Sequence, residues 1–111
     1  MCVFCNQIEQ DRILLNTIDW IAIYDKFPVS KGHVLLIPKG HFETYFDLPE
    51  RLKETMYYRI DEIKKHLDEK FHPDGYNVGF NSGTAAGQTV MHFHLHIIPR
   101  YNNDVDDPTG G

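Results

Sequence analysis

Apolar side chains recur at three- and four-residue spacing through the middle of the chain. The repeating positions are Leu52, Met56, Ile60, Ile63, Leu67 and Phe71. On an α-helix this spacing places all six side chains on one face. Asp47 as an acidic N-cap, with Pro49 in the first turn and Glu50 three residues later, predicts where the helix starts. The turn-forming residues 72–75 predict its end, because proline cannot continue a helix.

Shorter apolar segments on both sides of this helix predict strands. They are residues 12–15, 20–25, 32–38, 76–81 and the segment from 90 to 98. A short polar turn with proline and glycine joins the second and third segments, which favours an antiparallel pair. No internal repeat and no second domain are evident. We therefore predict an α+β fold, an antiparallel sheet of about five strands with one long helix on a face.

Composition limits the class of protein. A chain of 111 residues with 41% hydrophobic and 13% aromatic residues fits one compact domain, which we place at residues 1–101. Residues 102–111 form an acidic tail that ends in glycine. No apolar run approaches the roughly 18 residues that span a bilayer, and the N-terminus lacks the features of a signal peptide. We expect a cytoplasmic protein that does not enter a membrane.

The charge balance also limits the partners. The formal net charge is −5, and lysine and arginine form no patch or stripe. Binding of long nucleic acid would need a broad basic surface, so this function is not expected. A small phosphorylated ligand held by backbone N–H groups and histidines remains compatible with the charge.

Three histidines alternate with apolar residues near the C-terminus. His92, His94 and His96 are separated by Phe93 and Leu95, and Met91 and Ile97 continue the apolar set. On an extended strand, alternate residues share a face at steps of about 6 to 7 Å. The sequence therefore predicts a row of imidazoles on one face and core residues on the other. Imidazole can act as nucleophile, acid, base or metal ligand near neutral pH, so this row predicts a functional site.

A loop of small residues comes directly before the histidines. Asn81 ends the preceding segment, glycines including Gly87 follow, and Gln88 and Thr89 open the histidine segment. Glycines let the backbone approach an anion, and amide or hydroxyl groups can bind a phosphoryl oxygen. Taken alone, the loop is explained as a hairpin turn. Next to three aligned histidines, it is better explained as a phosphate site.

Taken together, these residues resemble the histidine triad (HIT) family of nucleotide hydrolases and transferases. The resemblance rests on residues 87–98, on Asn81, on His33 before Ile37-Pro38-Lys39, and on the N-terminal residues 2–5. It covers nearly the whole chain. The segment from His96 to Tyr101, followed by acidic residues, looks most like the bacterial branch of diadenosine polyphosphate hydrolases.

The resemblance implies catalytic roles. His94 would attack the α-phosphorus of a nucleotide and form a covalent nucleotidyl-histidine, which splits one displacement into two. His96 would bind the α-phosphate oxygens, and His33 would approach the same site from a neighbouring strand. Three further residues would contact the phosphate or the leaving group: Gln88, Thr89 and Asn81. No catalytic metal and no organic cofactor are expected.

The resemblance also implies a nucleoside pocket near the N-terminus and the second strand. Asp25 would accept hydrogen bonds from the ribose hydroxyls, and Phe4, Ile23 and Tyr24 would line the base site. Each residue has a plainer explanation. The three apolar and aromatic residues can be core, and Asp25 can cap the turn before Pro28.

Two cysteines at the N-terminus leave three explanations open. Cys2 and Cys5 can be a redox pair, half of a zinc site, or unpaired thiols. Family members with this N-terminus resemble zinc proteins that also use the histidine after the Pro-Lys strand end and the first triad histidine. The resemblance thus implies structural zinc on Cys2, Cys5, His41 and His92. His66 and His72 match no motif and are expected on the surface.

Two alternative functions compete with the nucleotide hydrolase. One is a zinc-dependent hydrolase in which the triad binds a catalytic metal. The other is a nucleotide-binding regulator with little turnover. The resemblance further implies a homodimer in which the long helix and the strand near Tyr76 merge two sheets into one. The sequence does not distinguish phosphoramidates from dinucleoside polyphosphates or nucleotide sugars as substrates.

Overall fold

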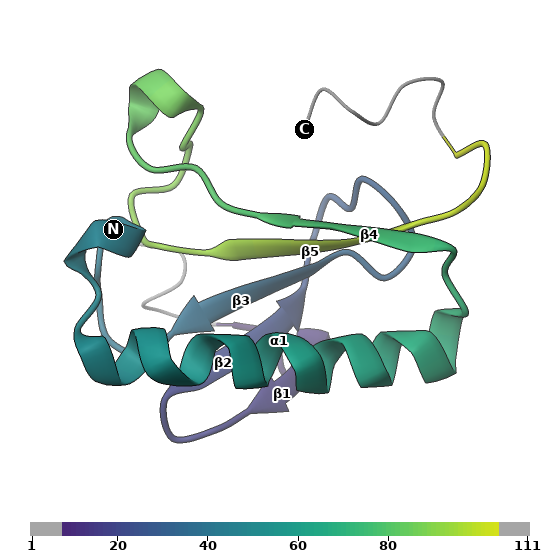
Figure 1. The fold of residues 1–111 in the computed structure, drawn as a ribbon, viewed down its shortest axis with the longest axis horizontal. Coiled ribbons are helices and arrows are strands. Elements are labelled where there is room, and N and C mark those ends of the chain that lie inside the picture. The colour runs from purple at the N-terminus through teal and green to yellow at the C-terminus, as the bar shows by residue number, and fades with distance from the viewer. Residues whose placement is uncertain (1–7, 105–111) are drawn as a thin grey trace.

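The computed structural model describes residues 8–104. Its strands are β1 (Ile13–Asn16), β2 (Trp20–Tyr24), β3 (Val34–Pro38), β4 (Gly75–Gly79) and β5 (Leu95–Arg100). Its helical elements are η1 (Gln10–Arg12), η2 (Tyr45–Asp47), α1 (Glu50–Phe71) and η3 (Thr84–Ala86). The strands form one antiparallel sheet in the order β1-β2-β3-β5-β4, and α1 lies along one face (Figure 1). The predicted fold class is confirmed.

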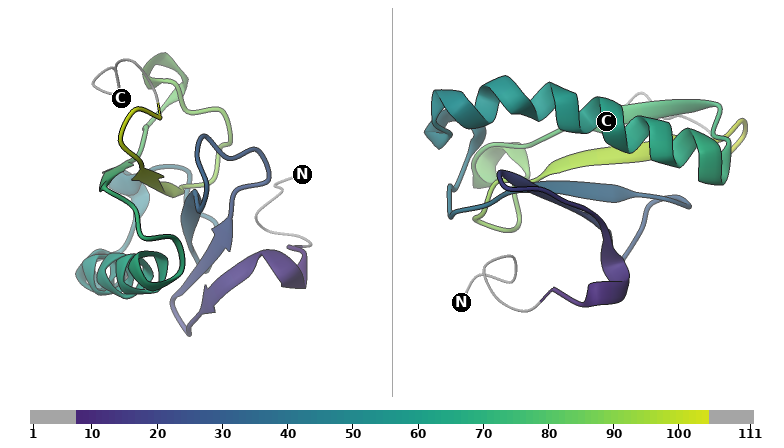
Figure 2. Two further views of the ribbon diagram at one scale, coloured as in Figure 1. Left: turned by 90° about the vertical axis from the view of Figure 1, so that its right-hand side faces the viewer. Right: turned by 90° about the horizontal axis from the view of Figure 1, so that it is seen from below.

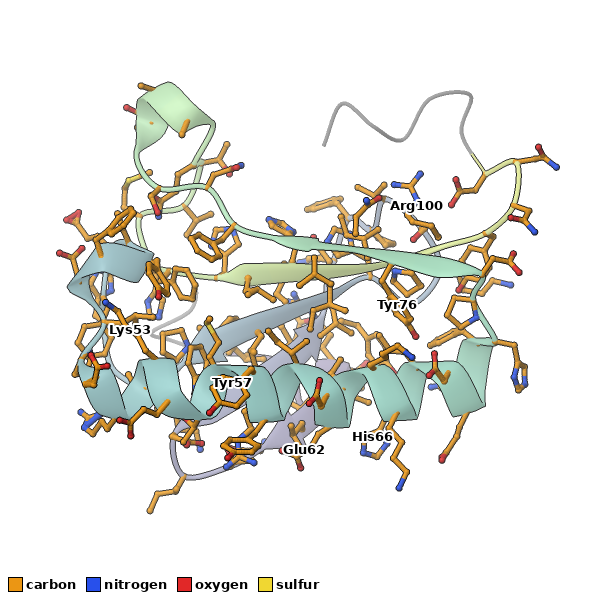
Figure 3. All side chains as sticks on the ribbon, viewed as in Figure 1. Lys53, Tyr57, Glu62, His66, Tyr76 and Arg100 are labelled. Carbon is orange, nitrogen blue, oxygen red and sulfur yellow. The ribbon has the colours of Figure 1, made fainter. Side chains whose placement is uncertain are left out.

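The stripe of apolar residues on α1 faces the sheet as predicted. Leu52, Ile63 and Leu67 are buried, while the outer face of the helix carries exposed residues such as His66 (Figure 3). The predicted cap is wrong. The N-cap of α1 is Pro49, and Asp47 instead closes the capping box of η2 with Thr44, because its carboxylate accepts the N–H of Thr44. The helix ends at His72, whose left-handed backbone (φ 52°) stops it.

Register between the strands divides their side chains between two faces. The helix-facing core contains Trp20, Ala22, Val34, Leu36, Leu48, Leu52, Ile63, Leu67, Phe93, Leu95 and Ile97. On the opposite face Ile23, Leu35 and Ile37 form a smaller buried cluster. β3 is buried along its whole length because it is central and both of its faces are covered. Figure 2 shows that the helix covers one face of the sheet and that η1 and β1 lie at the edge of the sheet remote from β4.

The histidine segment is only partly a strand. β5 begins at Leu95, so His96 lies in the sheet, whereas His92 and His94 lie in the irregular segment just before it. The prediction of a single row of three imidazoles is therefore wrong for His92, whose ring turns to His41. The alternation of core residues holds for Phe93, Leu95 and Ile97. Met91 is 36% exposed and is not part of the core.

No helix within residues 8–104 combines the length and apolar character needed to cross a membrane.

Candidate active site

A pocket of about 540 Å³ lies on the face of the sheet opposite α1. It is lined by Ile8, Glu9, Arg12, Ile23, Asp25, Lys26, Phe27, Leu35, Asn81, Gly87, Gln88, Thr89, Val90, His94 and His96. Eight of the residues predicted to bind or transform substrate thus meet in one cavity, although the sequence separates them by up to 73 positions. Loop residues 81–90 form one wall, and the strands form the floor.

Strand register explains why these side chains converge. Ile23 of β2 pairs with Leu35 of β3, and Leu35 pairs with His96 of β5. Directly opposed residues of neighbouring strands share a face, and so do residues two positions apart. Asp25, two residues after Ile23, and His94, two residues before His96, therefore lie on the same side. The hydrophobic pattern that builds the core thus also orients the polar residues of the site.

A hydrogen bond joins His33 and His96, and a backbone contact of His33 determines which of the two rings is the donor. His33 is buried, and its Nδ1 accepts the backbone N–H of Val29 at 3.0 Å. In a neutral ring the proton must then lie on Nε2, which donates to His96 Nδ1 at 2.9 Å. By the same logic His96 carries its own proton on Nε2. His96 is thus held as a hydrogen-bond donor.

Burial keeps this pair of histidines neutral. Burial, together with the neighbouring His94 and His33, lowers the pKa of His96 to about 4, while Asp25 opposes the shift. Burial also lowers the pKa of His33, again against the effect of Asp25, whose Oδ2 lies 3.6 Å from His33 Nε2. Desolvation disfavours the charged imidazole. Both rings therefore act as neutral hydrogen-bonding groups at neutral pH.

His94 carries its proton on Nδ1, unlike His33 and His96, which carry theirs on Nε2. Its Nδ1 lies 2.9 Å from the backbone carbonyl oxygen of His92, which can only accept, so Nδ1 carries the proton. The lone pair of the ring is therefore on Nε2. The ring of His94 stands 5.0 Å from that of His96, edge to face, and His94 lines the pocket. This arrangement presents a nucleophilic nitrogen beside a hydrogen-bond donor.

Gln88 lies in the wall of the pocket, and its side chain is fully engaged with the backbone. Its Nε2 donates to the carbonyl oxygens of Glu43 and Val90, at 2.6 and 2.9 Å, and its Oε1 accepts the N–H of Gly83 at 2.7 Å. The residue is 4% exposed. The expectation that this amide donates to the phosphate or leaving group is therefore corrected: Gln88 positions loop residues 83–90.

The remaining residues of the loop meet the expected placement. Asn81 and Thr89 are exposed and line the pocket. Gly87 ends η3 with φ +94°, a conformation that side chains disfavour, which explains the glycine at this position. On the opposite wall, Asp25 accepts the N–H of Phe27 at 3.1 Å. Asp25 thus caps the turn, as its plainer explanation required, and also borders the cavity.

One predicted base-site residue, Tyr24, is not among the residues that line the pocket. Tyr24 pairs with Val34, whose side chain belongs to the helix-facing core, and its ring packs edge to face against Phe71 at 6.3 Å. The expectation for Tyr24 is therefore wrong, because adjacent residues of a strand point to opposite faces. Ile23 lines the pocket as predicted. Phe4 lies outside the described residues.

Several residues of the pocket were not predicted. They are Ile8, Glu9, Arg12, Lys26, Phe27, Leu35 and Val90. Leu35 could have been found, because pairing of the second and third segments places it opposite Ile23. Glu9 and Arg12 left no signal, since Glu9 precedes η1 and Arg12 ends it, and their place at the pocket depends on how the sheet is assembled.

His41 and His92 form a separate pair that does not line this pocket. Their Nδ1 atoms are 3.1 Å apart, and the rings meet edge to face at 4.7 Å. Two nitrogens bound to one tetrahedral zinc stand at a similar separation, roughly 3.3 Å for bonds of about 2.0 Å. The donor atoms and their spacing fit two ligands of a zinc ion. Cys2 and Cys5 lie outside the described residues.

A second group of possible metal ligands includes two residues of the pocket wall, Asp25 and His96, and the buried His33. Asp25, His33 and His96 offer ligand atoms within 4.8 Å of one another. The His33 nitrogen that faces this group carries the proton, because its other nitrogen accepts from Val29. A protonated nitrogen cannot bind a metal. The hydrogen bond between the two histidines is therefore the better account of this group.

This fold, with a histidine-lined pocket on one face of the sheet, is found in known proteins, and comparison with them identifies the family. The model of the HIT domain matches residues 6–103, so the chain belongs to the HIT family. A HIT family protein from Bacillus anthracis has a similar crystal structure, with a TM-score of 0.87 and 36% identity over 93% of this chain and 75% of that one.

Two further relatives have informative names. A Zn-bound histidine triad family protein from Mycobacterium smegmatis is 33% identical, with a TM-score of 0.84 over 96% of this chain and 80% of that one. The adenosine 5'-monophosphoramidase of Schizosaccharomyces pombe is 34% identical over 93% of this chain and 77% of its own length.

Proposed function

We propose that this protein is a hydrolase that cleaves nucleotides at the α-phosphate through a covalent nucleotidyl-histidine on His94. The observation that carries the proposal is the tautomer of His94. Its Nδ1 proton is held by the His92 carbonyl, which leaves the lone pair on Nε2. Membership of the HIT family and the named activity of the Schizosaccharomyces pombe relative support the same reaction class.

In the first step, the Nε2 lone pair of His94 attacks the α-phosphorus. A P–N bond forms while the bond from phosphorus to the leaving group breaks, and the leaving group departs with the bonding electrons and takes up a proton. The neutral His96 donates from Nε2 to an α-phosphate oxygen, and His33 holds it in that orientation. Transfer of this kind depends mainly on positioning and on stabilisation of developing charge.

In the second step, water attacks the same phosphorus and the P–N bond breaks. The nucleoside monophosphate is released, and the electron pair returns to His94 Nε2. Asn81 and Thr89 are placed to contact the phosphate or the departing group, since both are exposed at the pocket wall. Phosphoramidates and dinucleoside polyphosphates share this reacting half, and a panel of both would identify the leaving group.

We also propose that the chain binds a structural zinc ion. His41 and His92 would hold it together with Cys2 and Cys5, and the Zn-bound relative from Mycobacterium smegmatis supports this assignment. The ion would tie the N-terminus to the end of β3, next to residue 38, and to the segment before β5. The histidines proposed to act in the reaction are His33, His94 and His96, and none of them is a proposed zinc ligand.

Replacement of the nucleophile tests the proposed reaction. His94→Ala is expected to lower kcat/KM on an adenosine phosphoramidate at least about 1,000-fold, because no other group in the pocket offers the same lone pair. His66→Ala is the matched control, since His66 lies exposed on the outer face of α1 (Figure 3). A folded His94→Ala variant that keeps activity within about tenfold of the parent would rule out this assignment.

A further inference from the structure

The wall of the pocket next to β1 carries a charged pair, Glu9 and Arg12. The Arg12 side chain is 22% exposed, and its Nε donates to the carbonyl oxygen of Tyr24 at 3.1 Å. One terminal nitrogen of Arg12 lies 3.8 Å from a Glu9 carboxylate oxygen. The guanidinium is thus held in a defined orientation with a carboxylate beside it. Neither residue takes part in the proposed reaction steps.

The sheet fixes where this pair lies relative to the catalytic histidines. Arg12 directly precedes β1, whereas His94 and His96 lie at β5, and β2 and β3 stand between them. Three steps between neighbouring strands amount to about 14 Å. Asp25 follows β2 and lies between the two ends, and Ile23 and Leu35 form an apolar floor. Phosphate at His94 and ribose at Asp25 therefore direct the base toward Arg12 and Glu9.

We propose that Arg12 and Glu9 recognise the base of the nucleotide and give the protein a preference for guanosine over adenosine nucleotides. This inference rests on the proposed function, because it assumes that a nucleotide binds with its α-phosphate at His94. Arg12 would donate to O6 and N7 of guanine, and Glu9 would accept from N1–H and from the 2-amino group. Ile23 and Leu35 of the floor would pack against the base.

The order of donors and acceptors decides between the two purines. Along the pocket wall, the guanidinium of Arg12 offers hydrogen-bond donors and the neighbouring carboxylate of Glu9 offers acceptors. The edge of guanine offers two acceptors, N7 and O6, followed by two donors, and matches that order throughout. Adenine alternates acceptor, donor and acceptor, so its 6-amino group would face the donors of Arg12. A pyrimidine lacks N7 altogether. Guanine is therefore the better match, whereas the named activities of relatives concern adenosine.

Calorimetric titration of the 111-residue chain with GMP and AMP tests this inference without any turnover. The protein is expected to bind GMP about tenfold more tightly than AMP, in the range typical of one bidentate contact to guanine. Arg12→Gln is expected to remove this difference. Arg51→Gln is the matched control, because Arg51 is exposed on α1, on the other side of the sheet, and should leave the difference unchanged.

Arg12→Gln also removes the hydrogen bond from Arg12 to the carbonyl oxygen of Tyr24, so a second variant is needed that keeps this bond. Glu9→Gln keeps that contact and removes the charged acceptor, so GMP affinity should fall several-fold with AMP affinity nearly constant. Thermal unfolding of each variant verifies that it is folded. Equal affinity of the parent for both nucleotides, or a GMP preference that survives in both variants, would overturn the inference.

Kinetics separate this inference from the proposed function. Guanosine and adenosine phosphoramidates with the same amine should differ in kcat/KM by a similar factor. Efficient hydrolysis of both at equal rates would refute the base recognition and leave the hydrolase intact. A GMP preference that depends on Arg12, with no turnover of either compound, would retain the recognition and refute the hydrolase.

Discussion

At the scale of single residues, the site depends on which ring nitrogen carries each proton. His33 accepts from a backbone N–H and therefore donates to His96, and His94 donates to a backbone carbonyl and therefore keeps its lone pair on Nε2. These tautomers follow from partners that can only donate or only accept. Three chemically identical side chains thereby obtain different hydrogen-bonding properties. The backbone around them, more than their own side chains, assigns those properties.

The lowered pKa of His96 predicts how stability depends on pH. The folded value of about 4 lies below the ordinary 6.5, so the unfolded chain binds more protons between these values. The free energy of unfolding should therefore fall as the pH drops below about 6.5. Urea unfolding at pH 7.5 and pH 5 is expected to show about 1 to 2 kcal/mol of loss attributable to His96.

The variant His96→Asn isolates this contribution. It should lose less stability than the parent between the two pH values, because its side chain does not titrate there. The buried His33 is present in both proteins, so its own pKa shift affects both measurements. An equal loss in parent and variant would show that His96 is not held neutral by burial.

At the scale of elements, the turn between β2 and β3 fixes the position of His33. Gly32 has φ +89°, and a Cβ at this residue would stand 2.9 Å from Cδ2 of Phe71 and 3.2 Å from Cγ of Pro99. Ser30 also donates to the carbonyl oxygen of Pro99. The turn is therefore packed against the end of α1 and against β5. Its geometry determines how His33 meets His96.

Replacement of Gly32 tests the importance of this close packing. Gly32→Ala is expected to cost about 1 to 3 kcal/mol of unfolding free energy, from the left-handed backbone and the contact with Phe71. Gly75→Ala is the matched control, because its Cβ would meet nothing within 4 Å and its φ is not positive. Chemical denaturation measures both. Comparable losses in the two variants would contradict the structural explanation.

Most elements could be predicted from the sequence because their signals are local. The stripe of α1 depends only on spacing, and β2 and β3 are continuous apolar runs bounded by turn residues, so these local signals predicted the α+β class. The cap of α1 was not predictable in this way, since Asp47 serves the preceding turn instead. The predicted strand was also too long, because it included His92 and His94, which precede β5. That segment is held by contacts with residues far away in the sequence. Gln88 donates to the carbonyl oxygen of Glu43, and the ring of His92 contacts that of His41.

The site was predicted less completely than the fold. Residues that belong to a motif, such as His94, His96 and Asn81, were found because the motif is compact in sequence. Arg12 and Glu9 join them only after β1, β2 and β3 are assembled. Tyr24 was misplaced because its neighbour Ile23 was assigned to the same face. Strict use of strand alternation would have avoided that error.

At the scale of the whole molecule, zinc should stabilise the fold without taking part in the reaction. Purified protein is expected to contain about one zinc ion per chain by elemental analysis, and His41→Ala should lose it. His66→Ala is the control and should retain it. Chelation should lower Tm while the initial rate of the still-folded protein is maintained. Immediate loss of activity with unchanged Tm would favour the catalytic-metal alternative.

The edge of the sheet predicts the oligomeric state. β4 pairs only with β5 among the described strands, and Val78 on it is 49% exposed. Tyr57 and Tyr58 on α1 are 54% and 58% exposed, and Tyr76 of β4 reaches α1 through Asp68 (Figure 3). We propose that a second copy covers this surface. Sedimentation at micromolar concentration should give twice the 13.0 kDa of one chain.

A charge placed on this edge tests the dimer. Val78→Lys should shift the protein toward the monomer, because a lysine on an edge strand opposes pairing with another strand. Ile18→Lys is the matched control, since Ile18 is 93% exposed in the turn between β1 and β2. A parent protein that sediments as a monomer would remove the dimer from the account.

The central claim is tested most directly by identifying the atom that carries the nucleotide during turnover. The protein is mixed with a nucleoside phosphoramidate and quenched at short times, and the linkage is located by peptide mass spectrometry and phosphorus NMR. We predict a nucleoside monophosphate on His94, joined through Nε2, that forms and decays fast enough to account for product release. A nucleotide on another side chain or on Nδ1, or product formed with no nucleotide on His94 at any quench time, would contradict the mechanism.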